Sequence, residues 1–147
     1  MTSEANDQHP PLDVEHPPEG KVPAIRQVMM PRDTNANGTI FGGIILAQID
    51  LAAAIEAHRW HPGRLATVAM DKVEFKRPVF VGDLVSFYTS TDRVGTTSVT
   101  VCVDVWSQRR FGGNTRVPVT RATVTMVATD EGGHKVPIQN RDPAPLY

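Results

Sequence analysis

The pattern of apolar residues predicts one helix near the middle of the chain. Residues 44–58, IILAQIDLAAAIEAH, contain no glycine or proline and are rich in alanine and leucine, which favour helices. The segment is too short to span a bilayer and too apolar to lie on a surface, so we expect a buried helix. Pro62 and Gly63 follow, and residues of this type belong just beyond the end of a helix.

Further along the chain, apolar and polar residues alternate with a period of two, which is typical of strands. The clearest example is 96–106, where every second residue from Val99 to Val105 is a valine and the residues between them are mostly polar. Strands are also predicted over 23–30, 65–77, 84–94 and 117–130. Short loops join the last four strands, and short loops favour antiparallel pairing.

Together these elements predict an α+β domain in which a curved antiparallel sheet of five to six strands wraps around one apolar helix. One helix cannot cover both faces of such a sheet, so a partner must cover the other face or an edge. We therefore expect a homo-oligomer. The domain is predicted to span residues 23–138, with a tail at 1–22 and a proline-rich C-terminal tail at 139–147 that extends away from it.

Composition narrows the class of protein. A chain of 147 residues with 40% hydrophobic residues is typical of one globular domain. The single cysteine, Cys102, rules out an intrachain disulfide and a multi-cysteine metal site. No apolar run approaches about 18 residues, and the net charge of -1 gives no reason to expect a nucleic-acid partner. We therefore expect a cytoplasmic protein that binds neither membranes nor nucleic acid.

The charge is distributed unevenly along the chain. Residues 1–22 hold five acidic residues and one basic residue, a net charge of −4, so the rest of the chain carries +3. This segment also contains four prolines and few large apolar side chains, so burial cannot offset the entropy lost on ordering. We therefore predict a flexible acidic tail over residues 1–22.

Asp50 is the residue that fits its surroundings least. It lies within the apolar helix, where a carboxylate is costly unless it is paired. At about 100° per residue, its side of the helix carries mostly small residues, namely Gly43, Leu46, Ala47, Ala53, Ala54 and Ala57. Small neighbours leave room for another chain or a ligand, so Asp50 is a candidate catalytic acid. The alternative is a structural acid that bonds backbone groups or an arginine.

The loop before the helix, PRDTNANGTIFGG at 31–43, offers further candidates. Gly42 and Gly43 would let a substrate oxygen approach the unpaired N–H groups at the helix start, which is one way to build an oxyanion site. Glycines at such a position are more often part of a tight turn. Asn35 and Asn37 suit either an Asx-turn or the orientation of a water molecule or a carbonyl. The pattern does not choose between these alternatives.

The sequence shows none of the common motifs for other kinds of catalysis. It contains no HExxH motif, no GxSxG elbow and no P-loop, and its histidines lack metal-ligand spacing. Cys102 lies in the middle of a predicted strand, which is more typical of a packed residue than of a nucleophile. The basic residues Arg109, Arg110, Arg116 and Arg121 fit either a solvated loop or a phosphate contact.

The loop and the helix together, PRDTNANGTIFGGIILAQID at 31–50, closely resemble the signature of hotdog-fold acyl-CoA thioesterases. The nearest type is that of the bacterial YciA-like enzymes, related to the cytosolic acyl-CoA hydrolases of animals. The similarity continues through 66–83, 94–106 and 119–133 and covers residues 23–138. It implies a hotdog fold, in which a long helix is wrapped by an antiparallel sheet and two protomers pair edge to edge. Such dimers often assemble into a trimer of dimers.

The resemblance also implies a reaction, namely the hydrolysis of acyl-CoA to CoA and a free carboxylic acid. No cofactor is expected, because coenzyme A is part of the substrate and of the product. By this resemblance Asp50 acts as general base or nucleophile, and Asn35 of the opposite protomer places the water or the thioester. The backbone N–H of Gly42 or Gly43 would polarise the thioester carbonyl.

Contacts to CoA are implied as well, from the following residues: Thr97, Ser98, Arg109, Arg110 and Arg116. This chain departs from the family pattern near the substrate. Ile44 replaces a bulky aromatic residue and Ala52-Ala53 replaces two glycines, and both changes alter the acyl pocket. Thr96 replaces a basic residue, so one phosphate contact is either lost or made by one of these arginines.

Three related functions compete with this interpretation. A non-catalytic hotdog protein that binds acyl-CoA would be expected to lack the acid, whereas Asp50 and Asn35 are both retained. A thioesterase acting on acyl-carrier-protein thioesters would use the same chemistry, and loss of the phosphate contact would favour it. A hotdog dehydratase is disfavoured, because those enzymes pair the acid with a histidine and none lies between residues 23 and 57.

Overall fold

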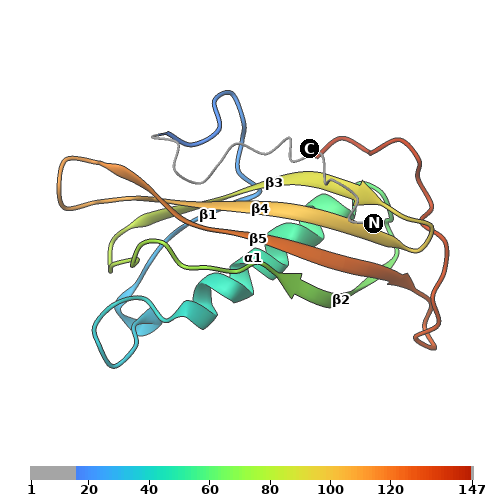
Figure 1. Ribbon diagram of the computed structural model, residues 1–147, viewed down its shortest axis with the longest axis horizontal. Coiled ribbons are helices and arrows are strands. Elements are labelled where there is room, and N and C mark those ends of the chain that lie inside the picture. Colours follow the sequence, from blue (N-terminus) through green and yellow to red (C-terminus); the bar gives the residue numbers. More distant parts are fainter. Residues whose placement is uncertain (1–15, 147) are drawn as a thin grey trace, which may run out of the picture.

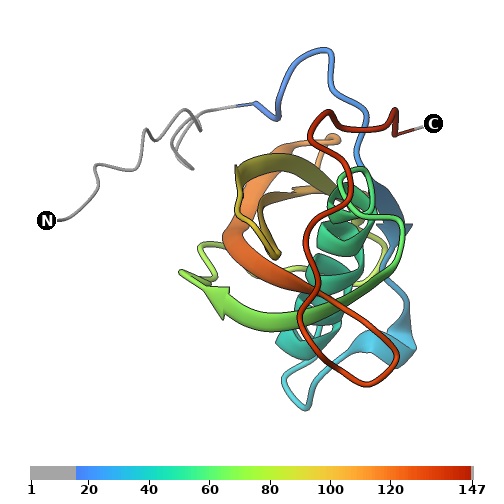
Figure 2. The same cartoon turned by 90° about the vertical axis from the view of Figure 1, so that its right-hand side faces the viewer.

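Five strands form one antiparallel sheet that curls around a single long helix (Figures 1 and 2). The computed structural model describes residues 16–146. Its elements are β1 (Ile25–Val28), α1 (Gly42–Ala57), β2 (Arg64–Asp71), β3 (Leu84–Val94), β4 (Ser98–Gln108) and β5 (Arg116–Thr129), with a short 3-10 turn at Pro31–Asp33. The sheet order is β1-β3-β4-β5-β2, so β1 and β2 are its edges. The predicted α+β architecture is confirmed, with five strands.

The interior lies between α1 and the middle strands. The four alternate valines from Val99 to Val105 on β4 have no exposed surface and pack in one cluster with the helix. Ile45 and Ile49 of α1 are buried in the same cluster. Burial of each such side chain contributes roughly 1.5–3 kcal/mol. The predicted alternation of this strand is confirmed, because its apolar side meets the helix.

The helix α1 begins two residues earlier than predicted. Its first residues are Gly42 and Gly43, its N-cap is Phe41, and no side chain caps this end. The helix is apolar on nearly all sides, yet the sheet covers only one of them. Leu51 and Ile55 on the uncovered side are 54% and 38% exposed. The prediction of a buried helix therefore holds for only part of its surface in a single chain.

The segment after β2 is not the strand that its alternating pattern predicts. β2 ends at Asp71, although the pattern continues to residue 77. Lys72 has a φ of 58°, a left-handed conformation that turns the chain out of the sheet. Residues 73–79 then run past β5, where the N–H of Lys76 donates a hydrogen bond of 2.7 Å to the carbonyl oxygen of Val119.

The C-terminal segment is bound to the domain, whereas the sequence predicts that it extends away. Ile138 is 4% exposed and packs in the core. Beyond it, the N–H groups of Asn140 and Ala144 each donate a hydrogen bond of 2.8 Å, to the carbonyl oxygens of Trp60 and Arg59 respectively. Those carbonyls lie in the turn just after α1. The segment therefore holds the turn that follows the helix.

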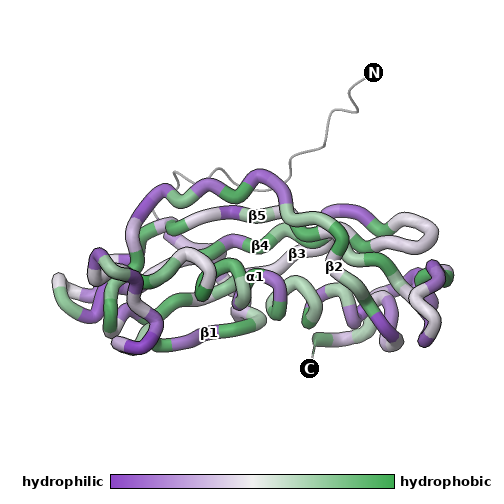
Figure 3. Tube along the Cα trace, turned by 90° about the horizontal axis from the view of Figure 1, so that it is seen from below, coloured by the Kyte–Doolittle hydropathy of each residue, from purple (hydrophilic) through white to green (hydrophobic). Residues whose placement is uncertain are grey.

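The acidic tail predicted for residues 1–22 lies mostly outside the described residues. In its described part, Pro17 is buried against the sheet face opposite α1. Within residues 16–146, no helix is both long and apolar enough to cross a membrane. Hydrophilic residues gather in the loops at the two ends of the sheet (Figure 3).

Candidate active site

Asp50 lies in the middle of α1 and bonds to the edge strand β2. Its Oδ1 accepts a hydrogen bond of 2.6 Å from Oγ1 of Thr67. Asp50 is partly exposed, and no lysine or arginine within residues 16–146 pairs with it. The alternative of an acid held by an arginine is therefore not seen in the described part of the chain. That part also contains no group of three or more His, Cys, Asp or Glu side chains that could hold a metal ion.

The surroundings of Asp50 are open on one side, because β2 has no neighbour beyond it. The register between β2 and β5 shifts between Thr67 and Ala69, which marks a β-bulge in the edge strand. At the bulge, Val68 is 58% exposed, although valine is usually a buried residue. An unpaired edge with an exposed apolar side chain next to an acid indicates a place for a second chain.

The N-terminal end of α1 offers backbone donors. The first hydrogen bond at this end joins the N–H of Ile44 to the carbonyl oxygen of Phe41 at 3.0 Å. The N–H groups of Gly42 and Gly43 precede it and have no partner within the helix. A Cβ atom at Gly43 would lie 2.3 Å from Cε1 of Phe41, so glycine lets the aromatic ring lie close to the backbone. These donors and the positive end of the helix dipole suit a developing oxyanion.

Gly43 and Asp50 lie on the same side of α1 but at different heights. They are seven residues apart, nearly two turns. At a rise of about 1.5 Å per residue, that spacing separates them by about 10 Å along the helix axis. A thioester carbonyl bound at the N–H of Gly43 is therefore too far from Asp50 of the same chain for one reaction centre to use both.

Asn35 organises the loop before the helix. Its Oδ1 accepts hydrogen bonds from the backbone N–H groups of Asn37 and Thr39, at 2.9 and 3.2 Å. Its Nδ2 donates to Oγ1 of Thr39 at 3.0 Å. This is the self-bonded turn that the sequence left open as one alternative. A contact between Asn35 and a substrate stays a prediction.

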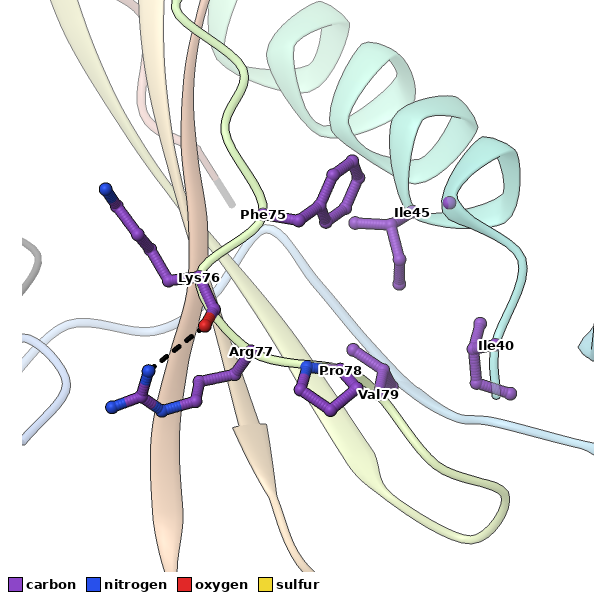
Figure 4. A pocket seen from close by; sticks show the side chains of 8 residues that line it. Ile40, Ile45, Phe75, Lys76, Arg77, Pro78 and Val79 are labelled. Atoms are coloured by element: carbon purple, nitrogen blue, oxygen red, sulfur yellow. Dashed lines mark hydrogen bonds between the residues drawn. The ribbon is translucent and has the colours of Figure 1, made fainter. Parts of the chain in front are cut away.

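A cavity of about 270 Å³ lies beside the first turn of α1 (Figure 4). Apolar side chains form the wall near the helix, and Phe75 points toward Ile45. The ring of Phe75 lies 3.6 Å from the position that a Cβ of Gly42 would take. Lys76 and Arg77 also line the cavity, and Figure 4 shows their side chains directed away from the helix. The cavity thus combines an apolar wall with a basic rim.

The alternating pattern predicts a strand over 65–77, so it does not point to these three lining residues, Phe75, Lys76 and Arg77. One signal in the chain was available to find them. Two adjacent basic residues followed by Pro78 interrupt the alternation, and a proline at that position does not continue a central strand.

The residues predicted to contact CoA do not come together in one chain. Thr97 and Ser98 lie where β4 begins, whereas Arg109, Arg110 and Arg116 lie around the hairpin where it ends. β4 has 11 residues. At about 3.3 Å per residue, it holds the two groups about 36 Å apart. Both groups can serve one CoA molecule only if different chains supply them.

Two arginines of the basic cluster singled out in the sequence, Arg109 and Arg121, already have carboxylate partners. Nη1 of Arg109 forms a short ion pair with Oδ2 of buried Asp83, and its guanidinium lies 4.6 Å from the ring centroid of Phe80. Nε of Arg121 pairs in the same way with Asp104. Arg109 therefore holds its hairpin in place, and the exposed Arg110 and Arg116 are the better candidates for phosphate.

The chain matches known proteins over most of its length. Residues 37–110 match the family model of the thioesterase superfamily. The chain is 37% identical over 127 residues to the acyl-CoA thioester hydrolase YciA of Salmonella typhimurium, covering 85% of this chain and 95% of that protein. It is 40% identical over 118 residues to YciA of Escherichia coli, covering 79% of this chain and 89% of that protein.

Solved structures show the same architecture. A hexameric hotdog fold thioesterase of Campylobacter jejuni shares 49% sequence identity with a TM-score of 0.75, over 80% of this chain and 90% of that chain. A hexameric broad specificity acyl-coenzyme A thioesterase shares 39% identity with a TM-score of 0.77, over 82% of each chain. The curled sheet around α1 is therefore a hotdog fold.

Proposed function

The chain belongs to the thioesterase superfamily, and on that premise we propose that it hydrolyses acyl-CoA to CoA and a free carboxylic acid. The observation that carries the proposal is Asp50, a carboxylate in an apolar helix that bonds a hydroxyl and pairs with no cation in the described part of the chain. Relatives at 37% and 40% identity that are named acyl-CoA thioester hydrolases support the substrate class.

We propose that two protomers share each active site. The N–H groups at Gly43 and the acid at Asp50 are about 10 Å apart along one helix, so they can meet one carbonyl only across two chains. Antiparallel pairing of two β2 edges would extend the sheet and lay the two helices side by side on the same face. This pairing would also cover Leu51, Ile55 and Val68, which one chain leaves exposed.

The same arrangement brings the loop of Asn35 from the second protomer toward Asp50. The amide of Asn35 would then contact the water or the thioester in addition to shaping its loop. Both solved relatives are hexamers, which supports assembly of this chain into three such dimers.

The proposed chemistry uses Asp50 as general base. Its free oxygen accepts a proton from water, and the water oxygen bonds to the thioester carbonyl carbon. Negative charge develops on the carbonyl oxygen, where the N–H groups of Gly42 or Gly43 from the second protomer stabilise it. The carbon–sulfur bond then breaks, and the CoA thiolate takes the proton back from Asp50. No cofactor takes part in this sequence of steps.

Direct attack by Asp50 is the alternative route to the same products. The carboxylate would displace CoA and form a mixed anhydride, which water would then hydrolyse. A single turnover in ¹⁸O-water separates the two routes. Label in the Asp50 carboxylate supports direct attack, because general-base hydrolysis places the water oxygen only in the acid product.

The cavity beside Gly42 fits part of an amphiphilic substrate. Its apolar wall, with Phe75 and Ile45, would take the acyl chain next to the helix end where the carbonyl is polarised. The rim residues Lys76 and Arg77 are positively charged and would attract the phosphates of CoA. The arrangement therefore favours a substrate with an apolar chain and several negative charges.

Release of free thiol from a panel of acyl-CoA substrates, C2 to C16, tests the proposal. Asp50→Asn keeps the shape of the side chain and removes the base, so we expect its rate to fall by about 10²–10⁴. Glu131→Gln, which alters an exposed acid in a turn, is the matched control and should retain activity. Full activity in Asp50→Asn would show that the acid is not catalytic.

Two further outcomes separate the related functions. Binding of acyl-CoA without turnover would indicate a non-catalytic hotdog protein. Turnover of acyl-carrier-protein thioesters alone would indicate a carrier-protein thioesterase, which the absence of a basic residue at Thr96 would suit. Comparison of CoA with dephospho-CoA thioesters measures how much the 3′-phosphate contributes.

A further inference from the structure

The sheet face opposite α1 carries a small cavity at which the N-terminal part of the chain is anchored. The cavity has a volume of about 90 Å³ and is lined by Pro17. Its other walls include Tyr88 of β3, Trp106 of β4, Arg26 of β1 and Arg116 of β5. Pro17 is buried there, and Tyr88 and Trp106 are only 7% and 4% exposed. Pro17, near the start of the described residues, therefore lies on the outer face of the sheet.

Two arginines beside this anchor lack a carboxylate partner within residues 16–146. Arg26 and Arg116 are both exposed, and neither forms an ion pair in that range. Nε of Arg26 donates a hydrogen bond of 2.9 Å to the neutral Oγ of Ser86. On the same face, Arg121 pairs with Asp104. Within residues 16–146, therefore, no carboxylate pairs with the positive charges of Arg26 and Arg116 near Pro17.

The residues just upstream of Pro17 are acidic. Glu15 and Asp13 stand two and four residues before it. An extended chain spans at most about 3.6 Å per residue, so their Cα atoms lie within about 7 Å and 14 Å of Pro17. A tether this short keeps both carboxylates at an effective concentration in about the millimolar range or above. Both carboxylates are therefore within reach of the cavity that Pro17, Arg26 and Arg116 line.

We propose that the acidic segment upstream of Pro17 docks on the outer face of its own sheet, with Asp13 and Glu15 paired to Arg26 and Arg116. The net charges of the tail and of the rest of the chain, −4 and +3, are complementary. An exposed pair contributes only about 0.2–1 kcal/mol, so the anchor at Pro17 is needed to supply proximity. The docked segment competes with other anions for Arg116.

Carbodiimide cross-linking of the full chain tests this docking. Arg116→Lys keeps the positive charge and supplies an amine that forms an amide with a nearby carboxylate. We expect peptide mapping to find residue 116 joined to Asp13 or Glu15, in a product that migrates as one chain on a denaturing gel. Arg32→Lys, in the exposed turn before α1, is the matched control and should give no such link.

Neutralising the two acids provides a second comparison. Asp13→Asn with Glu15→Gln removes the two carboxylates that the carbodiimide would activate, so any remaining link from residue 116 comes from other acids. We expect the total yield from Arg116→Lys to fall by about tenfold, because those acids do not reach the amine at high local concentration. Equal yields from Arg116→Lys and Arg32→Lys would overturn the proposal. The same link in a product of twice the chain mass would assign the segment to a second copy instead. No outcome depends on hydrolysis, so the test is separate from that of the proposed activity.

Discussion

The hydrogen bond between Thr67 and Asp50 joins the helix to the edge strand at the proposed reaction centre. A hydroxyl partner orients the carboxylate without neutralising its charge, as a lysine or arginine would. It also occupies Oδ1, so that Oδ2 is the oxygen left to accept a proton from water. The helix α1 therefore sets the position of the acid, and the strand β2, through Thr67, sets the direction of its free oxygen.

Thr67→Val tests this orienting role. The substitution keeps the shape of the side chain and removes the donor, so we expect kcat to fall by about tenfold with a smaller change in KM. That loss corresponds to one hydrogen bond worth about 1–1.5 kcal/mol. Steady-state kinetics measure the effect, and Thr67→Ser, which retains the hydroxyl, should stay near the wild-type value. Full activity in Thr67→Val would show that Asp50 does not need the hydrogen bond from Thr67 for catalysis.

The candidate acid was predictable from the sequence, but its partner was not. Asp50 is conspicuous because it is a charge within an apolar helical run, and that signal is local. Thr67 stands 17 residues away and reaches Asp50 only because β2 pairs next to β5 at the edge of the sheet. Arg109 shows the converse case, since a residue predicted to contact CoA pairs instead with Asp83.

The segment between β2 and β3 shows how a single backbone conformation changes an element. The alternation of residues 65–77 is that of one long strand, but Lys72 adopts a left-handed φ and the chain leaves the sheet after Asp71. Phe75 consequently lies against the start of α1 rather than in the sheet. The cavity beside the helix exists because of this departure.

Phe75→Ala tests the assignment of that cavity to the acyl chain. Removal of the ring enlarges the cavity, so we expect relative kcat/KM to move toward longer chains. Each additional buried methylene is worth about 0.8 kcal/mol, or roughly fourfold in rate. The thiol-release panel measures this shift. Phe80→Ala is the matched control, because Phe80 is similarly exposed but packs on Arg109. A uniform rise in KM across all chain lengths would instead assign the cavity to the CoA part of the substrate.

One chain leaves several apolar side chains uncovered on the helix and the edge strand that carry the proposed site. Leu51 and Ile55 on α1 and Val68 on the edge strand are all exposed. The sequence predicts a partner for this reason, and the hexameric state of the two solved relatives agrees with that prediction. The acid and the backbone donors also need a second chain to meet, so we expect assembly and activity to be lost together.

Val68→Asp tests this coupling. It places a charge on the edge strand, where two symmetry-related copies would repel each other and resist burial. We expect a smaller assembly mass by light scattering and a fall in kcat/KM of about 10² or more, comparable to loss of the general base. Val22→Asp, at a position that is also exposed but lies outside the sheet, should change neither quantity. An intact, active assembly of Val68→Asp would place the interface elsewhere.

Local patterns in the sequence were enough to predict the helix, the alternation of β4, and β3 with both of its ends. They also identified the acid in the helix and the resemblance that led to the family. They did not predict the order of the strands, the end of β2, or the binding of the C-terminal segment to Trp60 and Arg59. Periodicity and side-chain type act between near neighbours, whereas those features depend on hydrogen bonds between residues far apart in the chain. Only the tertiary structure could show that Asp50 bonds Thr67 of an edge strand, where the sheet is open to a second chain.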